Sequence, residues 1–210
     1  LFGGDFAGND RQLQGNIAIG NEALDATGTN AHSGTIAIGY NALTACTSGS
    51  ANTAVGYGSM DALTTGSNNT GLGDRSLSAT DDGANNTAVG AFAMESGNCG
   101  DNNTAVGYNS LRLCTGGNNT AFGEGTMDDL VEGNDNVAIG KAAMGGALDA
   151  TADASSGNVF IGKDAGGGAW VTAVSEYNVA IGHQAMDDAL NGANYNVAIG
   201  RRAATMLVSG

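Results

Sequence analysis

One five-residue pattern recurs along the whole chain and constrains the fold more than any other feature. Eleven copies of a polar residue, usually Asn, followed by three mostly apolar residues and Gly, such as "NTAVG" at 103–107, follow one another at intervals of 16 to 22 residues. Self-similarity at such a period is typical of repeat proteins, in which each unit packs on its neighbours. We therefore predict a single repeat domain over residues 1–210, with coils of 16–22 residues and no separate linker. The copies end at the closing glycines Gly20, Gly39, Gly56, Gly73, Gly90, Gly107, Gly123, Gly140, Gly162, Gly182 and Gly200.

The residues within each copy predict a short strand followed by a turn. Thr, Val or Ile at the second position favours a strand, and the closing glycine permits the positive φ of a tight turn. A Leu or Met four residues after most closing glycines is expected to return to the core. Because side chains alternate along a strand, we expect Thr104 and Val106 to face the core and Asn103 and Ala105 to face outward. No segment has the apolar spacing of a helix.

A single unit of about 17 residues cannot bury a core, so the units must stack. We predict an all-β, parallel β-solenoid of eleven to twelve coils, a rod of roughly 50 Å at about 4.8 Å per coil. The asparagines and the closing glycines would then form structural ladders, in which stacked amide side chains bond to one another. The ladder residues are Asn52, Asn69, Asn86, Asn103 and Asn119, with Gly56, Gly73, Gly90, Gly107 and Gly123.

The alanine in the middle of most copies suggests that another surface approaches closely, because it is small and the strand pattern places it on the outer face. We interpret that surface as a subunit interface in a homotrimer.

The composition argues against several classes of partner. The formal net charge is −14, from 21 acidic and 7 basic residues, so the chain is poorly suited to neutralise a nucleic-acid backbone or to bind an anionic membrane. No apolar run reaches the roughly 18 residues of a membrane span, so membrane insertion is not expected. The chain has 36 glycines, no proline and few aromatic residues. Such a chain buries its surface in thin layers of small side chains.

The sequence indicates no catalytic site, and we predict a protein that is not an enzyme and needs no cofactor. No nucleophile elbow, phosphate-binding loop or zinc-protease motif is present. Adjacent acids at 81–82, 128–129 and 187–188 fall in or near the outer loops. They indicate calcium only weakly, because their spacing fits no known loop template. No metal ligands are therefore assigned.

Two other solenoids were weighed as alternatives. A hexapeptide acyltransferase requires an apolar residue at every sixth position, whereas this chain repeats its apolar-Gly signature once per coil. An ice-binding solenoid requires an exposed threonine array. In this chain Thr alternates with Val and Ile at a position that the strand pattern assigns to the core. Both alternatives are therefore disfavoured.

Several copies resemble a known family. "NVAIGKAAM", "YNVAIGHQAM" and "YNVAIGRRA" are similar to the head repeats of YadA-like trimeric adhesins, and "NNTAVGYNSL" at 102–111 resembles repeats of bacteriophage tail fibres. The resemblance implies a left-handed parallel β-roll, a homotrimer, and an extracellular role in host or surface attachment. Most coils here are slightly longer than those of adhesin heads, and these 210 residues carry the pattern of neither a stalk nor a membrane anchor. These departures favour a virion tail fibre or related surface appendage over the alternative, the head of a bacterial trimeric autotransporter adhesin at the cell surface.

Attachment would involve a host receptor or glycan, and other fibre or virion proteins. Candidate receptor contacts are Trp170 and Tyr177 near the longer intervals, and the variable pair Tyr108 and Asn109. Alternatively, Trp170 fills the core position that Gly166 leaves vacant.

The three cysteines fit no disulfide framework. Cys99 and Cys114 can neighbour each other on adjacent coils, whereas Cys46 lies four coils from Cys114, roughly 19 Å at the spacing of strands. We interpret all three as small buried apolar residues.

Overall fold

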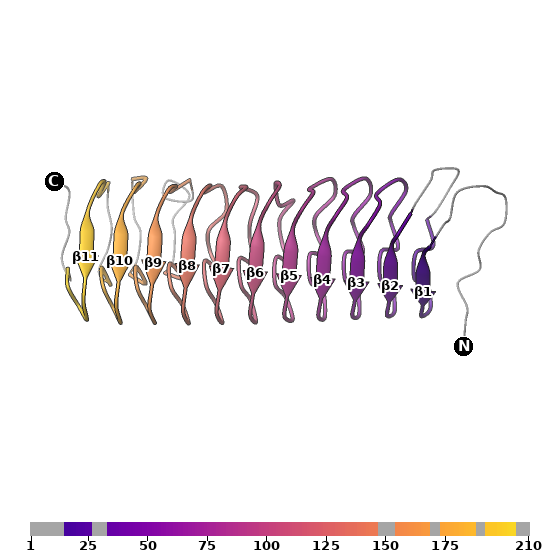
Figure 1. Ribbon diagram of the computed structural model, residues 1–210, viewed down its shortest axis with the longest axis horizontal. Helices are drawn as coiled ribbons and strands as arrows, with labels where there is room; N and C mark the ends of the chain where they lie inside the picture. The colour runs from indigo at the N-terminus through magenta and orange to yellow at the C-terminus, as the bar shows by residue number, and fades with distance from the viewer. Residues whose placement is uncertain (1–14, 27–32, 147–153, 169–172, 188–191, 205–210) are drawn as a thin grey trace.

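The chain folds into one straight parallel β-solenoid (Figure 1). The computed structural model describes residues 15–26, 33–146, 154–168, 173–187 and 192–204. These ranges contain eleven three-residue strands in one parallel sheet, ordered as in the sequence, and no helix. The prediction of an all-β parallel solenoid, with one strand per copy of the pattern, is confirmed. The strands are β1 (Ile17–Ile19), β2 (Ile36–Ile38), β3 (Thr53–Val55), β4 (Thr70–Leu72), β5 (Thr87–Val89), β6 (Thr104–Val106), β7 (Thr120–Phe122), β8 (Val137–Ile139), β9 (Val159–Ile161), β10 (Val179–Ile181) and β11 (Val197–Ile199).

Each coil is hydrogen-bonded to the next with every repeat in register. The middle residue of each strand pairs with the middle residue of its neighbours, as Ala105 does with Ala88 and Ala121. The Thr104 amide donates to the carbonyl of Asn119 at 2.8 Å. Beyond the strand, the Leu111 amide donates to the carbonyl of Thr126, also at 2.8 Å. The ladder therefore continues around the coil, which satisfies backbone groups that three-residue strands alone would leave unpaired.

The two faces of the sheet are the reverse of those expected from the sequence. Ala105 is fully buried, whereas Thr104 and Val106 are only half-buried, and the middle residue is the buried one in every strand from β2 to β11. Asn103, two positions before Ala105, is also fully buried. The prediction that Thr104 and Val106 face the core is therefore wrong. In this narrow coil a column of Leu and Met side chains occupies the interior, and only a methyl group fits beneath the strand.

That column was expected to return to the core, and the structure confirms it. Its members have φ between 50° and 56°, the left-handed region, which turns the chain sharply enough to aim each side chain under its strand. An Ala, Ser or Thr directly before each of them is buried as well. The column comprises Leu24, Leu43, Met60, Leu77, Met94, Leu111, Met127, Met144 and Met186.

The coil that begins with β9 fills its interior differently. Phe160 replaces the usual alanine and is fully buried, while Gly166 stands where other coils carry Leu or Met. A β-carbon at Gly166 would lie 3.0 Å from the Phe160 ring. Phe160 therefore occupies the space that Gly166 leaves, the role considered for Trp170 in the sequence. Trp170 itself lies outside the described residues.

Candidate functional site

The repeated asparagines form a buried ladder at the N-terminal ends of the strands. The Oδ1 atom of Asn103 accepts from the backbone amide of Asn119 at 2.9 Å, and its Nδ2 donates to the carbonyl of Gly116 at 2.9 Å. Each asparagine thus holds the next coil in place, and no ligand can reach it. The fully buried members are Asn52, Asn69, Asn86, Asn103, Asn119, Asn136, Asn158 and Asn178.

The residue before each ladder asparagine has a different task, which explains the doubled asparagines in the sequence. Asn102 is exposed and has a φ of 64°, and Asn68 and Asn85 have φ of 61° and 60°. Asparagine tolerates this left-handed backbone better than most residues do. The first asparagine of each pair therefore turns the chain, and the second joins two coils.

Asn69→Ala should lower the free energy of unfolding by about 3 kcal/mol, because two buried backbone groups lose their partners at about 1–3 kcal/mol each. Asn69 Nδ2 donates to the carbonyl of Gly83 at 2.8 Å, and its Oδ1 accepts from the amide of Asn86 at 2.9 Å. The matched control is Asn68→Ala, which costs only about 1 kcal/mol of left-handed strain. Urea unfolding followed by circular dichroism measures both. Equal losses in the two variants would show that the ladder adds nothing.

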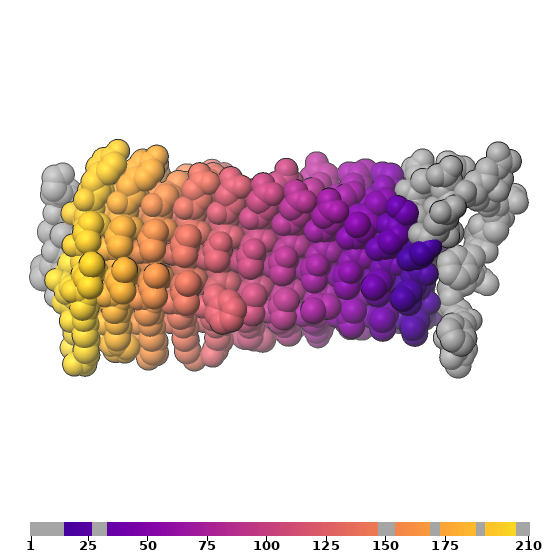
Figure 2. All heavy atoms as spheres, viewed as in Figure 1, coloured from indigo at the N-terminus to yellow at the C-terminus, as the bar shows by residue number. Residues whose placement is uncertain are grey.

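The outer face of the sheet runs along all eleven strands, and its side chains are half-buried or exposed. It consists of the first and third residues of each strand, and we call it the outer sheet face. Strands β3 to β7 contribute a Thr followed by Val, Leu or Phe, and the other strands contribute two aliphatic residues. The side chains line up in rows along the rod (Figure 2). Its most exposed apolar members are Ile17 (46%), Ile19 (41%), Leu72 (37%), Phe122 (56%), Ile139 (40%), Ile181 (37%), Val197 (68%) and Ile199 (68%).

Five threonines of this face stack in register. They are Thr53, Thr70, Thr87, Thr104 and Thr120, one from each strand between β3 and β7. The ice-binding alternative was disfavoured because these residues were expected to point into the core. That reason does not hold, because the threonines lie on the outer sheet face.

The predicted receptor contacts do not form one site. Tyr108, 52% exposed, follows β6 and packs edge-on against Phe92 with ring centroids 5.8 Å apart, while Asn109 beside it is half-buried. Tyr177, 53% exposed, precedes β10 and stacks on Tyr195 at 5.3 Å. Tyr108 therefore lies beyond the end of its strand and Tyr177 before the start of another strand, four coils away. Each belongs to a separate pair of aromatic side chains.

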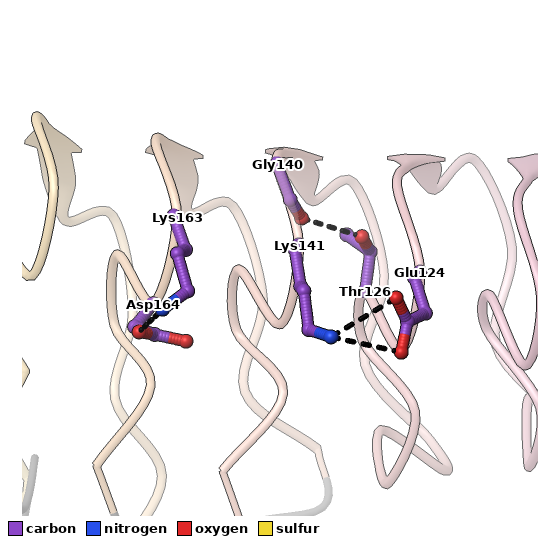
Figure 3. Close-up of polar contacts among 6 residues, drawn as sticks. All are labelled: Glu124, Thr126, Gly140, Lys141, Lys163 and Asp164. Atoms are coloured by element: carbon purple, nitrogen blue, oxygen red, sulfur yellow. Dashed lines mark hydrogen bonds and ion pairs between the residues drawn. The ribbon is translucent and has the colours of Figure 1, made fainter.

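The row that immediately follows the closing glycines changes character along the rod. Near the N-terminus it carries Tyr40 and Tyr57, whose rings stack at 5.4 Å. After β7 it carries charged residues (Figure 3), where Lys141 Nζ contacts both carboxylate oxygens of Glu124 at 3.0 Å. Lys163 contacts Asp164 at 3.3 Å. These ion pairs are exposed and so contribute little to stability.

Thr126 anchors the same region to the next coil from inside. Its Oγ1 donates to the carbonyl of Gly140 at 2.7 Å (Figure 3). The closing glycine is therefore held by a neighbouring side chain as well as by the backbone ladder.

The acidic pairs at 81–82 and 128–129 have partners within the chain, whereas Asp188 of the third pair lies outside the described residues. Arg112 Nε donates to Asp128 at 2.7 Å, and Arg112 lies 3.8 Å from Asp129. Partial burial and the charge of Asp128 raise the pKa of Asp129, which Arg112 opposes. Asp81 accepts a hydrogen bond from Thr64 Oγ1. Within the described ranges, no three His, Cys, Asp or Glu side chains are grouped to hold a metal ion.

Sequence reasoning missed the outer sheet face because it assigned the β-branched residues to the core. The sequence did offer one signal, which is how strictly each position recurs. The buried Asn recurs more strictly than the residue after it, which lies on the outer sheet face. No helix of the described segments is long and apolar enough to cross a membrane. Comparison of the chain with known protein families, curated proteins and solved structures finds no match.

Proposed function

We propose that the protein is a non-enzymatic, homotrimeric rod of an extracellular fibre, such as a phage tail fibre or a related surface appendage, that mediates attachment to a host surface. The observation that carries this proposal is the outer sheet face, where each of the eleven strands presents at least one apolar side chain and where the side chains stay half-buried or exposed in the single chain. At roughly 50 by 10 Å it is as large as the patches that mark interaction surfaces on soluble proteins.

Other copies of the same chain are the partners that fit this face best. The face repeats at every coil, about every 4.8 Å, and a second copy in register presents the same repeat. A closed symmetric arrangement covers the face on every copy. The number three comes from the resemblance to adhesin and tail-fibre repeats. The strand alanines cannot form the subunit interface, because they are buried within the chain. The proposed interface is therefore made by the Thr, Val and Ile side chains on the other face of the strands.

Within this proposal, the rod acts by holding its loops and surface side chains in fixed positions for contact with a host. Packing of the outer sheet faces leaves the loops and the aromatic pairs around the outside of the fibre. Tyr108, Asn109, Tyr177 and Trp170 remain the candidate contacts for a host receptor or glycan, and three chains would multiply weak contacts by avidity. The head of a bacterial trimeric adhesin would work in the same way.

Val89→Asp combined with Val106→Asp should convert the assembly into monomers without unfolding the chain. Both side chains are only half-buried in the single chain, but packing of the faces would bury their charges without partners. Light scattering after size exclusion should give three times the 20.6 kDa chain mass for the wild type and one chain mass for the variant. Circular dichroism should remain unchanged.

The matched control carries the same two charges elsewhere. Asn68→Asp combined with Asn118→Asp places them at exposed turn positions off the outer sheet face, and this variant should remain trimeric. A wild-type chain that is monomeric at every concentration would refute the proposal.

The threonine row supports a second candidate, an ice-binding surface. Its five stacked hydroxyls lie on the outer sheet face in register. Leu72 and Phe122 interrupt the row of valines beside it, and the aliphatic strands at both ends offer no hydroxyl. These interruptions favour the homotrimer. Thermal hysteresis in a monomeric wild-type rod would reverse that preference.

A further inference from the structure

Two of the three cysteines lie on consecutive coils inside the rod. Cys99 follows β5 and Cys114 follows β6, and each is 1% exposed. Cys46 is also buried but follows β2, four coils before Cys114. At about 4.8 Å per coil, Cys46 is therefore roughly 19 Å from Cys114.

An irregularity in the repeat brings Cys99 into the interior. Seven residues after the closing glycine, the neighbouring coils place a buried side chain: Cys46, Leu63, Thr80, Cys114 and Leu130. The coil that begins with β5 carries Gly97 at this position, where a β-carbon would lie 2.2 Å from the carbonyl oxygen of Cys114. No side chain fits there. Cys99, two residues later, supplies the buried side chain instead.

The two cysteine side chains interact across neighbouring coils, because the presence of Cys99 raises the pKa of Cys114. The backbones beside them are also joined, because the Gly100 amide donates to the carbonyl of Gly116 at 3.2 Å. Gly100 directly follows Cys99, and its amide also donates to the carbonyl of Thr115, which directly follows Cys114, at 3.2 Å. Because neighbouring coils lie about 4.8 Å apart, facing residues on them fall within the Cα separation of about 4.4–6.8 Å that a disulfide spans.

We propose that Cys99 and Cys114 are a site of disulfide formation that joins the coils of β5 and β6 covalently, while the Cys46 thiol stays reduced. A small-molecule disulfide such as oxidised glutathione is the oxidant. The thiolate of one cysteine attacks it and releases one glutathione thiolate, leaving a mixed disulfide on the protein. The thiolate of the other cysteine attacks the protein sulfur of this mixed disulfide and releases the second glutathione. The two thiols lose two protons, and two electrons pass to the oxidant.

Burial determines when the bond forms. In the folded rod the neighbouring Cys99 side chain, and then burial, raise the pKa of Cys114. The reactive thiolate is therefore scarce in the folded state, and the oxidant has little access. Oxidation occurs during folding, before the coils close. The closed loop of about 15 residues should raise the melting temperature by about 6–12 °C relative to the reduced protein.

Counting thiols after refolding tests the proposal. The wild-type chain is refolded from denaturant in a mixture of oxidised and reduced glutathione, quenched with acid, and labelled with a maleimide under denaturing conditions. We expect one label, on Cys46, and a mass lower by two hydrogen atoms before labelling. Reduction by a phosphine before labelling should give three labels. Peptide mapping without reduction should find Cys99 joined to Cys114.

Two cysteine variants serve as controls. Cys46→Ala should take up no label after oxidation, because its two remaining thiols are paired. Cys99→Ala leaves Cys114 without a partner, so Cys114 should carry a maleimide or a glutathione. Three labels on refolded wild-type protein with the native circular dichroism spectrum would overturn the proposal, as would a crosslink that involves Cys46. Because the wild-type count decides, the test stands even if a variant fails to fold.

Discussion

Gly107→Ala should prevent the rod from folding or lower its free energy of unfolding by about 4 kcal/mol or more. Gly107 has a φ of 138°, and a β-carbon there would lie 2.3 Å from the carbonyl oxygen of Gly123 in the next coil. The clashing atom belongs to the backbone, so no side-chain rotation can relieve the overlap. The two coils would have to separate and break the hydrogen bonds between them.

Substitutions at two other glycines serve as controls that distinguish the steric clash at Gly107 from the strain of a positive φ. Gly125→Ala adds a β-carbon at φ 60° with no atom within 4 Å, and it should cost about 1 kcal/mol. Gly200→Ala keeps the closing-glycine conformation, with a φ of 122° and the nearest atom 4.0 Å away. It should cost about 1–3 kcal/mol. Urea unfolding by circular dichroism gives all three values. If Gly107→Ala cost no more than Gly200→Ala, the close approach of the coils would not be the cause.

Phe160→Ala should lower the free energy of unfolding by about 3–5 kcal/mol, the range for truncating a buried aromatic side chain. Phe160 is fully buried, and Gly166 beneath it offers no side chain that can move into the space. The variant therefore leaves a cavity in the coil that begins with β9. Urea unfolding measures the loss.

A second substitution in the same coil should restore the stability that Phe160→Ala loses. Gly166→Met alone should destabilise the rod, because the added side chain meets the Phe160 ring. Phe160→Ala with Gly166→Met restores the alanine and methionine of the coil that begins with β8, and should come within about 1 kcal/mol of the wild type. Gly166 has a φ of 64° and the methionine of that coil, Met144, a φ of 50°. Purely additive losses in the double-mutant cycle would contradict this exchange.

The repeat alone predicted the fold because its spacing leaves few alternatives. Eleven units of about 17 residues, each with one β-branched strand and one closing glycine, must stack to bury anything. The positions of all eleven strands follow from "NTAVG" and its variants. The burial of Met94 and Leu111 followed from their constant distance to the closing glycine.

The candidate site was less predictable, because it depends on which face of each strand is inside. Alternation defines two faces but does not choose between them. Thr104 and Val106 suit a core as well as an outer surface, and apolar character favoured the core. The preference is reversed by the width of the coil, which is set by contacts between residues distant in the sequence.

The amino-acid sequence by itself therefore determined that this chain is a parallel solenoid, where its strands and turns lie, and which Leu and Met side chains fill it. These features repeat with a fixed period and depend on local backbone preferences. Only the tertiary structure decided that Ala105 faces inward, that Phe160 compensates for Gly166, and that Cys99 is buried where Gly97 leaves no room for a side chain. Each of these depends on the space left between neighbouring coils, which backbone packing in three dimensions sets and no local pattern records.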